Sequence, residues 1–308
     1  MNMNEQDEIN FRDILDSIVQ SKMLILVTIV TFAICSLVFS LSLTNKFTSS
    51  STLMVVNESG TTSRSSSSLD MISSIAGINL SGQGLSKSEF VITTITSRDF
   101  LRHLLTFEDI KPTLAAFKSY DKFSKKIIFN ESIYDSEAKL FTNDLLKLPT
   151  FQKIYNRYIR IVSVSKSKSG FITISVNHES PEFAYTFLSL IINELNTISR
   201  KKDLIESQDS LRYLNSELAK TKQIEIKNSI NQLILSELRK QMFAEVRTNY
   251  LINPLDQPFL PELKSSPNRA KICIYGTILG FFIGILIALG VVFGFVFCSS
   301  FLGVKVRY

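Results

Sequence analysis

Two long runs of uncharged, mostly apolar residues lie near the ends of the chain, and the sequence between them is polar. The first extends from Met23 to Leu43, and the second from Ile272 to Val304, with its densest apolar part ending near Phe297. A bilayer core of roughly 30 Å needs about 20 apolar residues in a helix. The sequence therefore predicts transmembrane helices at 23–43 and 272–297, with residues 44–271 on one side of a membrane.

The alternative for the first run is a cleaved secretion signal. The apolar core of such a signal is about 7–15 residues long, which is shorter than this run. Only Ser40-Leu41-Ser42 resembles a cleavage site, and it does so weakly. We therefore expect an uncleaved helix, preceded by a short N-terminal tail over residues 1–22 and matched by a short C-terminal tail over 298–308.

The second run carries glycines at a spacing of four residues, at Gly276, Gly280 and Gly284. This spacing places them on one face of a helix, where the backbone of another helix can approach closely. The alternative is that glycine is simply frequent in membrane helices. We expect a helix-packing face.

Charge and cysteine usage limit the classes of site between the two runs. The chain has 34 Lys and Arg and 28 Asp and Glu, a net charge of +6, and the two signs are interspersed as on a solvated surface rather than a nucleic-acid interface. Cys35, Cys273 and Cys298 all lie in the apolar runs, so we expect the domain between the runs to have no disulfide. His103 and His178 are far apart and have no cysteine nearby, so we expect solvated or hydrogen-bonded histidines and no metal site.

Residues 46–180 are expected to form an α/β base. Ser97 is a candidate N-cap, as is Ser180, which precedes a proline at a first helical position. The expected elements are strands at 46–56, 158–165 and 171–176, a polar loop at 59–68, and helices within 86–105, at 135–148 and from Pro149.

A very long helical segment follows over residues 181–249. There is no glycine or proline between Pro181 and Pro254. Apolar residues recur at helical steps: Leu204, Leu211, Leu214, Leu218, Ile226, Ile230, Leu233 and Leu238. One helix or a barely interrupted pair of about 65 residues would reach roughly 100 Å. Its apolar stripe must be buried, either in a coiled coil or αα-hairpin within one subunit or, the interpretation we prefer, against other copies in a ring.

The chain then returns toward the second apolar run. Residues 245–254 are compatible with a strand. The return segment over 250–271 is rich in proline, which removes backbone donors and fixes φ. It therefore predicts an extended and stiff strut between the domain and the membrane helix.

The end of the chain resembles the proline/glycine signature of bacterial chain-length determinants, the co-polymerases of surface polysaccharides. The resemblance is carried by Pro258, Pro261, Ser266, Pro267, Gly280 and Gly284. The order of the other elements, from SRDFLRHLL to the long helical segment, is similar to that family over the whole chain. One departure is Asn268, because the family usually has lysine after the Ser-Pro pair. Arg269 and Lys271 are then the expected membrane-proximal basic groups.

The resemblance implies an α+β membrane protein. Two terminal transmembrane helices flank a periplasmic α/β base domain that carries a very long protruding helix. The protein would lie in the bacterial inner membrane with both termini in the cytoplasm. Copies would form a ring of about eight subunits. The ring would act with a polysaccharide polymerase on lipid-linked polysaccharide and set its modal length, O antigen being the first candidate.

No enzymatic role is expected, and no cofactor, metal or nucleic acid. The sequence has no phosphate-binding loop of the G-x-x-x-x-G-K-[ST] type and no recognisable catalytic set. So few residues follow the second apolar run that we expect neither a kinase domain nor a sensory output module there. The remaining alternative is a periplasmic adaptor of a capsule or exopolysaccharide export system.

Overall fold

The computed structural model describes residues 22–56, 87–142, 144 and 148–302, with side chains up to Gly290. It divides the chain into two compact units. The terminal unit combines the two chain ends, up to Asn45 and from Ser265 onward. The central unit comprises Lys46–Lys264. The predicted loop at 59–68 lies outside the described residues.

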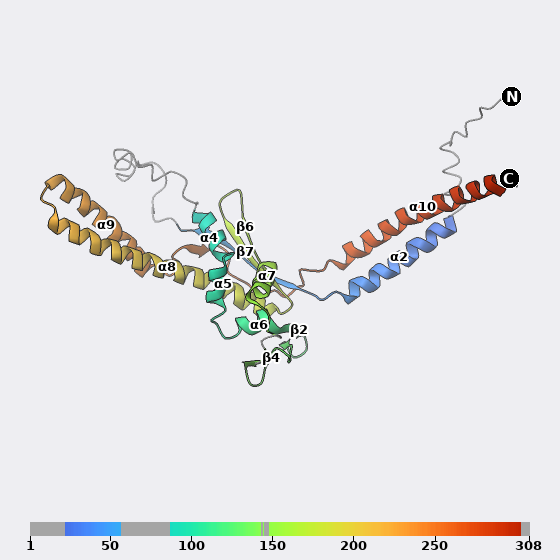
Figure 1. Ribbon diagram of the computed structural model, residues 1–308, viewed down its shortest axis with the longest axis horizontal. Helices are drawn as coiled ribbons and strands as arrows, with labels where there is room; N and C mark the ends of the chain where they lie inside the picture. The colour runs from blue at the N-terminus through green and yellow to red at the C-terminus, as the bar shows by residue number, and fades with distance from the viewer. Residues whose placement is uncertain (1–21, 57–86, 143, 145–147, 303–308) are drawn as a thin grey trace, which may run out of the picture. The chain divides into compact units, whose positions relative to one another are not determined.

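The terminal unit is a pair of antiparallel helices, α2 (Lys22–Ser42) and α10 (Arg269–Leu302) (Figure 1). Both are long and apolar enough to cross a membrane, which confirms the two apolar helices expected from the sequence. Most of their large apolar side chains are exposed, as suits helices surrounded by lipid. The second helix is longer at both ends than the predicted 272–297.

The central unit is built on an antiparallel sheet with the strand order β6-β7-β1-β8. Its strands are β1 (Phe47–Val55), β6 (Val162–Lys166), β7 (Ile172–His178) and β8 (Ile252–Pro254). β6 and β7 form the predicted hairpin, and Gly170 in its turn has a φ of 88°, which glycine adopts without strain. Every second residue of β7 is buried, so one face of the sheet belongs to the core.

Helices pack against this sheet or against one another and complete the core. They are α4 (Lys87–Ile95), α5 (Arg98–Leu104), α6 (Ile110–Ala116), α7 (Phe151–Ile161) and the first half of α8 (Pro181–Lys220). α8 packs on β1 and β7 with buried Phe187, Ile191 and Leu195. Both predicted caps are confirmed, because Ser97 Oγ accepts from Phe100 N and Ser180 Oγ from Phe183 N, each at 3.1 Å.

The helix predicted at 135–148 is wrong over its described part. Residues 134–141 form a short hairpin of β4 (Tyr134–Asp135) and β5 (Leu140–Phe141). Asp135 Oδ1 accepts hydrogen bonds from the backbone N–H groups of Glu137 and Ala138, at 2.9 and 3.1 Å, which favours a turn over a helix. The rings of Tyr134 and Phe141 pack together across the hairpin.

The strand predicted at 158–165 is wrong in its first half, because α7 continues to Ile161. Ile154 and Tyr158 are both buried, and their spacing of four residues is that of a helix face. Tyr158 is fully buried, and its hydroxyl donates to the carbonyl of Ile95 at 2.7 Å. Tertiary packing of this side chain therefore decides the local structure. A further hairpin, formed by β2 (Phe117–Asp121) and β3 (Lys126–Phe129), lies between α6 and β4 in the chain.

The long helical segment is an interrupted pair of helices that fold into an αα-hairpin. α8 ends at Lys220, and α9 (Ile224–Val246) runs back along it (Figure 1). Thr221 and Gln223 have extended backbone conformations, which produce the reversal without glycine or proline. The hydroxyl of buried Ser207 donates to the carbonyl of Glu237 at 3.0 Å, so the two helices approach closely. Part of the predicted apolar stripe is thus buried in an αα-hairpin within one subunit, which was the alternative to packing against other copies.

The strand predicted at 245–254 is shorter than expected. α9 extends to Val246, and only Ile252–Pro254 pair with β1. The buried Asn196 side chain of α8 binds the backbone just before and within this strand. Its Oδ1 accepts from the N–H groups of Leu251 and Ile252, at 2.8 and 3.0 Å, and its Nδ2 donates to the carbonyl of Ile252 at 3.1 Å.

Candidate functional site

The proline-rich segment is fastened to β1 as far as Phe259. Leu255 N donates to the carbonyl of Thr52 at 2.9 Å. Two buried serines of β1 hold the next residues, because Ser51 Oγ donates to the carbonyl of Asp256 at 2.5 Å and Ser49 Oγ to that of Phe259 at 2.7 Å. The small polar residues in the middle of β1 therefore bind the return segment.

The structure divides the four residues of the predicted proline motif between the two units. Pro258 and Pro261 belong to the central unit, where Pro258 is half-buried and Pro261 is buried. Ser266 and Pro267 belong to the terminal unit and are both half-buried. No regular helix or strand forms over 255–265, in agreement with an extended segment.

Asn268 starts the second apolar helix, at the position where the sequence departs from the family pattern. Its Oδ1 accepts from the backbone N–H of Lys271 at 3.4 Å, as a helix N-cap does. Arg269 donates from Nη2 to Oδ1 of Asn45 at 3.2 Å, while the side chain of Lys271 is exposed. Arg269 therefore links the two chain ends within the terminal unit, whereas Lys271 is exposed.

The three predicted glycines of α10 all face α2. A Cβ at Gly280 would lie 2.6 Å from Cβ of Phe32, which is too short for two carbon atoms. A Cβ at Gly276 would overlap Ser36, and one at Gly284 would overlap Thr28. The glycines thus lie where the two helices have no room for a further methyl group. What this contact does in the membrane remains a prediction.

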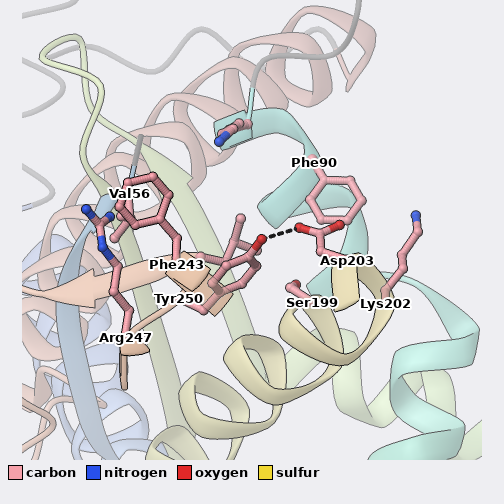
Figure 2. Close-up of a pocket in the computed structure, with 10 residues that line it drawn as sticks. Val56, Phe90, Ser199, Lys202, Asp203, Phe243, Arg247 and Tyr250 are labelled. Atoms are coloured by element: carbon pink, nitrogen blue, oxygen red, sulfur yellow. Dashed lines mark hydrogen bonds between the residues drawn. The ribbon is translucent and has the colours of Figure 1, made fainter. Parts of the chain in front are cut away.

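A cavity of about 190 Å³ lies in the central unit, where the end of α9 and the start of α4 meet α8 (Figure 2). Phe243 and Arg247 line one side, and Phe90 and Lys202 line the other. On each side a cation lies over an aromatic ring, with Arg247 Cζ 4.8 Å from the Phe243 ring centre and Lys202 Nζ 5.7 Å from that of Phe90. The remaining lining residues are Val56, Lys87, Ser199, Asp203, Tyr250 and Leu251.

The polar groups of this cavity are held in place from α8. The Tyr250 hydroxyl donates to Asp203 Oδ2 at 2.7 Å (Figure 2), and Lys240 Nζ lies 3.8 Å from Asp203 Oδ1. Arg200 Nη2 donates to the carbonyls of Arg247 and Thr248, at 2.6 Å each. Since these carbonyls follow the end of α9, this arginine binds α9 to α8 and fixes the backbone that carries Arg247.

A second, more open hollow of about 440 Å³ lies at the N-terminal end of α8. Its charged groups, Asp109, Lys125, Lys126, Lys139 and Glu182, are of both signs, and two of them have partners within the protein. Lys139 Nζ pairs with Glu108 at 2.7 Å, and the Tyr120 hydroxyl donates to Glu182 at 2.8 Å. Burial, and then the Glu182 carboxylate, raise the pKa of Tyr120 to about 12. This hollow therefore shows no preference for a ligand of one charge.

Neither histidine is arranged to bind a metal. Among the described residues, no group of three or more His, Cys, Asp and Glu side chains could hold an ion. His103 Nε2 lies 2.6 Å from Glu194 Oε2. His178 is buried between the rings of Phe117 and Phe183, accepts from the Ser180 N–H, and has its pKa lowered to about 4 by burial.

Comparison with known proteins identifies the N-terminal third of the sequence. Residues 7–106 match the family described as Wzz, chain length determinant protein. This part of the chain is similar to the chain length determinant domain of the Wzz family. This confirms the resemblance inferred from the proline and glycine motifs, which lie at the opposite end of the sequence.

Among solved structures, one similar chain is described as a full-length bacterial polysaccharide co-polymerase. It has 13% sequence identity and a TM-score of 0.37, and the match covers 91% of this chain and 97% of that one. The comparison with curated proteins gives no match.

The sequence analysis missed the cavity of Figure 2 and the role of Asn196. The cavity residues come from separate parts of the chain, at 56, 87–90, 199–203 and 243–251. Only the return of α9 along α8 brings Phe243 and Arg247 opposite Phe90 and Lys202. Asn196 carries a weak signal, because its amide follows a buried helix face of apolar residues, from Phe183 to Leu195.

Proposed function

We propose that this protein sets the modal chain length of a bacterial surface polysaccharide, with lipopolysaccharide O antigen as the first candidate. The observation that carries the proposal is the similarity of residues 7–106 to a chain length determinant domain, together with two apolar helices that enclose one large central unit. The protein acts as a co-polymerase, beside the polymerase that extends the lipid-linked glycan. Its contribution is to bind and position, without bond chemistry of its own.

The proposed topology has both termini in the cytoplasm and the central unit in the periplasm. α2 and α10 are its two membrane spans. Positive charges near the apolar runs do not choose an orientation, since Arg12 and Lys22 on one side are balanced by Lys46 and Lys264 on the other. Reporter fusions after Asn57 and after Tyr308 test it. A C-terminal fusion that is active only in the periplasm would contradict this topology.

The proposed oligomeric state is a homo-oligomer whose contacts between subunits involve the α8–α9 hairpin. The hairpin buries only part of its apolar stripe internally. Leu238, Met242 and Val246, at a spacing of four residues on α9, are 41%, 65% and 80% exposed. Apolar side chains exposed in a row commonly mark an interaction surface. Further copies of the same chain would cover them, and the assembly would present repeated surfaces to polymerase and glycan.

Deletion of the gene, followed by electrophoresis of the surface polysaccharide, tests the function directly. We expect the modal distribution of chain lengths to be replaced by a broad one dominated by short chains, and a plasmid copy to restore the mode. An unchanged distribution at the surface would contradict the proposal. Polysaccharide of normal length that remains inside the cell would instead identify an export adaptor.

A further inference from the structure

The cavity between α4, α8 and the end of α9 has the chemistry of a small ligand site. We propose that it binds an acidic sugar residue, a pyranose ring bearing a carboxylate, of the polysaccharide whose length the protein sets. This inference rests on the proposed function and adds the ligand and the residues that hold it. Lys202 and Arg247 are the groups proposed to bind the carboxylate, and Phe90 and Phe243 the groups proposed to contact the ring.

Charge favours an anion in this cavity. Lys202 and Arg247 contribute two cations, against the single carboxylate of Asp203. That carboxylate already accepts from the Tyr250 hydroxyl and lies near the Lys240 ammonium, so its charge is largely offset inside the protein. The guanidinium of Arg247 is a planar donor suited to a carboxylate. Arg247 and Lys202 lie on opposite sides of the cavity (Figure 2).

The aromatic rings favour a sugar over a simple anion. Phe90 and Phe243 are half-buried on opposite walls. The C–H face of a pyranose is apolar and packs on such a ring, while its hydroxyls remain available for hydrogen bonds. A phosphate ion would bind the cations alone and would make no contact of its own with the rings that they lie over. A neutral sugar would pack on the rings but would offer no negative charge to the cations.

The size and rigidity of the cavity suit one sugar unit of a longer chain. Its volume of about 190 Å³ is below the roughly 300–1,000 Å³ of sites for drug-sized ligands. The bonds from Arg200 to the carbonyls of Arg247 and Thr248 fix the backbone of one wall, so little ordering is needed on binding. A ring with this cavity in every subunit would bind a glycan at many points, each of them weak.

The test uses the full-length protein in detergent and titration calorimetry with a trimer of galacturonic acid. We expect a Kd of about 1 mM or tighter, and binding at least about tenfold weaker for the neutral galactose trimer. The double variant Lys202→Gln/Arg247→Gln should weaken binding of the acidic trimer by about tenfold or more. The matched control is Lys201→Gln/Lys222→Gln, which removes two exposed charges outside the cavity and should bind as the wild type does.

Circular dichroism checks that each variant is folded, and the single variant Lys202→Gln replaces the double one if the latter unfolds. The inference is overturned if the wild type shows no saturable binding, if the neutral trimer binds equally well, or if the cavity variant binds like the control. Inorganic phosphate that displaces the trimer at equal concentration would also overturn it, as an anion site without sugar recognition. Chain-length loss on gene deletion together with any of these results would refute this site and leave the proposed function standing.

Discussion

At the scale of single residues, Asn196 holds the return of the chain to the sheet. Its amide makes three hydrogen bonds to the backbone of Leu251 and Ile252, and all of them are buried. Asn196→Leu would leave these backbone groups without partners, at a cost of about 1–3 kcal/mol each, partly relieved by local movement. We expect a loss of roughly 3 kcal/mol and a clearly lower thermal unfolding midpoint by circular dichroism in detergent. Asn193→Leu, one turn earlier on the exposed face, is the matched control, and equal midpoints would contradict this role.

His178 makes the central unit sensitive to acid. Burial lowers its pKa to about 4, from about 6.5 in an unfolded chain. The unfolded state therefore binds more protons than the folded state between these values, and stability falls as the pH drops from about 6.5 to 4. Arg157 and Lys46 are the nearby charges that further disfavour the protonated ring. We expect His178→Gln to reduce the slope of unfolding midpoint against pH in this window, and the same slope as the wild type would refute this assignment.

At the scale of elements, the contact between α2 and α10 depends on glycine. Leucine at Gly280 and Gly284 would overlap Phe32 and Thr28, so the two helices would have to separate. Leucine keeps both positions apolar, so insertion of the helix into the membrane should be retained. We expect Gly280→Leu/Gly284→Leu to abolish the modal polysaccharide length at normal protein levels, as measured by gel and immunoblot.

Gly290→Leu is the control for this pair, because a Cβ at Gly290 meets no atom within 4 Å. It adds a similar apolar side chain to the same helix and should keep the wild-type length distribution. A normal distribution from the double variant would show that close approach of these helices is not needed for function.

At the scale of the whole molecule, the proline segment is the covalent link from the central unit to the second apolar helix. Proline restricts φ to about −65° and keeps the residue before it extended. We expect Pro258→Ala/Pro261→Ala/Pro267→Ala to alter polysaccharide length while the central unit still folds and assembles. The core of that unit is formed before Pro254, and Ser49 and Ser51 still hold the backbone of Asp256 and Phe259. Wild-type lengths would reduce the prolines to a simple linker.

Assembly is the other property of the whole molecule that can be measured. The exposed apolar side chains of α9 predict a homo-oligomer in mild detergent at micromolar concentration. Light scattering should give a mass several times that of the 34.8 kDa chain. Met242→Lys/Val246→Lys should lower this mass, because two buried charges would oppose the contact. A monomeric wild type would contradict the oligomer.

The sequence alone determined the features that depend on local chemistry. Two runs without charge predict two long apolar helices, because a helix satisfies its own backbone in lipid. Ser97, and Ser180 followed by Pro181, predict where helices begin, because an N-cap needs only the next turn. The proline and glycine motifs can also be read from the sequence, because each constrains the backbone at its own position. They carried the resemblance to the chain-length determinants.

Only the tertiary structure decided the features that depend on distant partners. The reversal at 221–223 contains no glycine or proline from which a turn could be predicted. It is stabilised by contacts between α8 and α9, such as that of Ser207 with Glu237. Residues 158–161 alternate like a strand but are helical, because Tyr158 packs in the core and binds Ile95. The cavity exists only after this packing is complete. Long-range burial outweighs local preference wherever a side chain gains more from the core than its own segment loses.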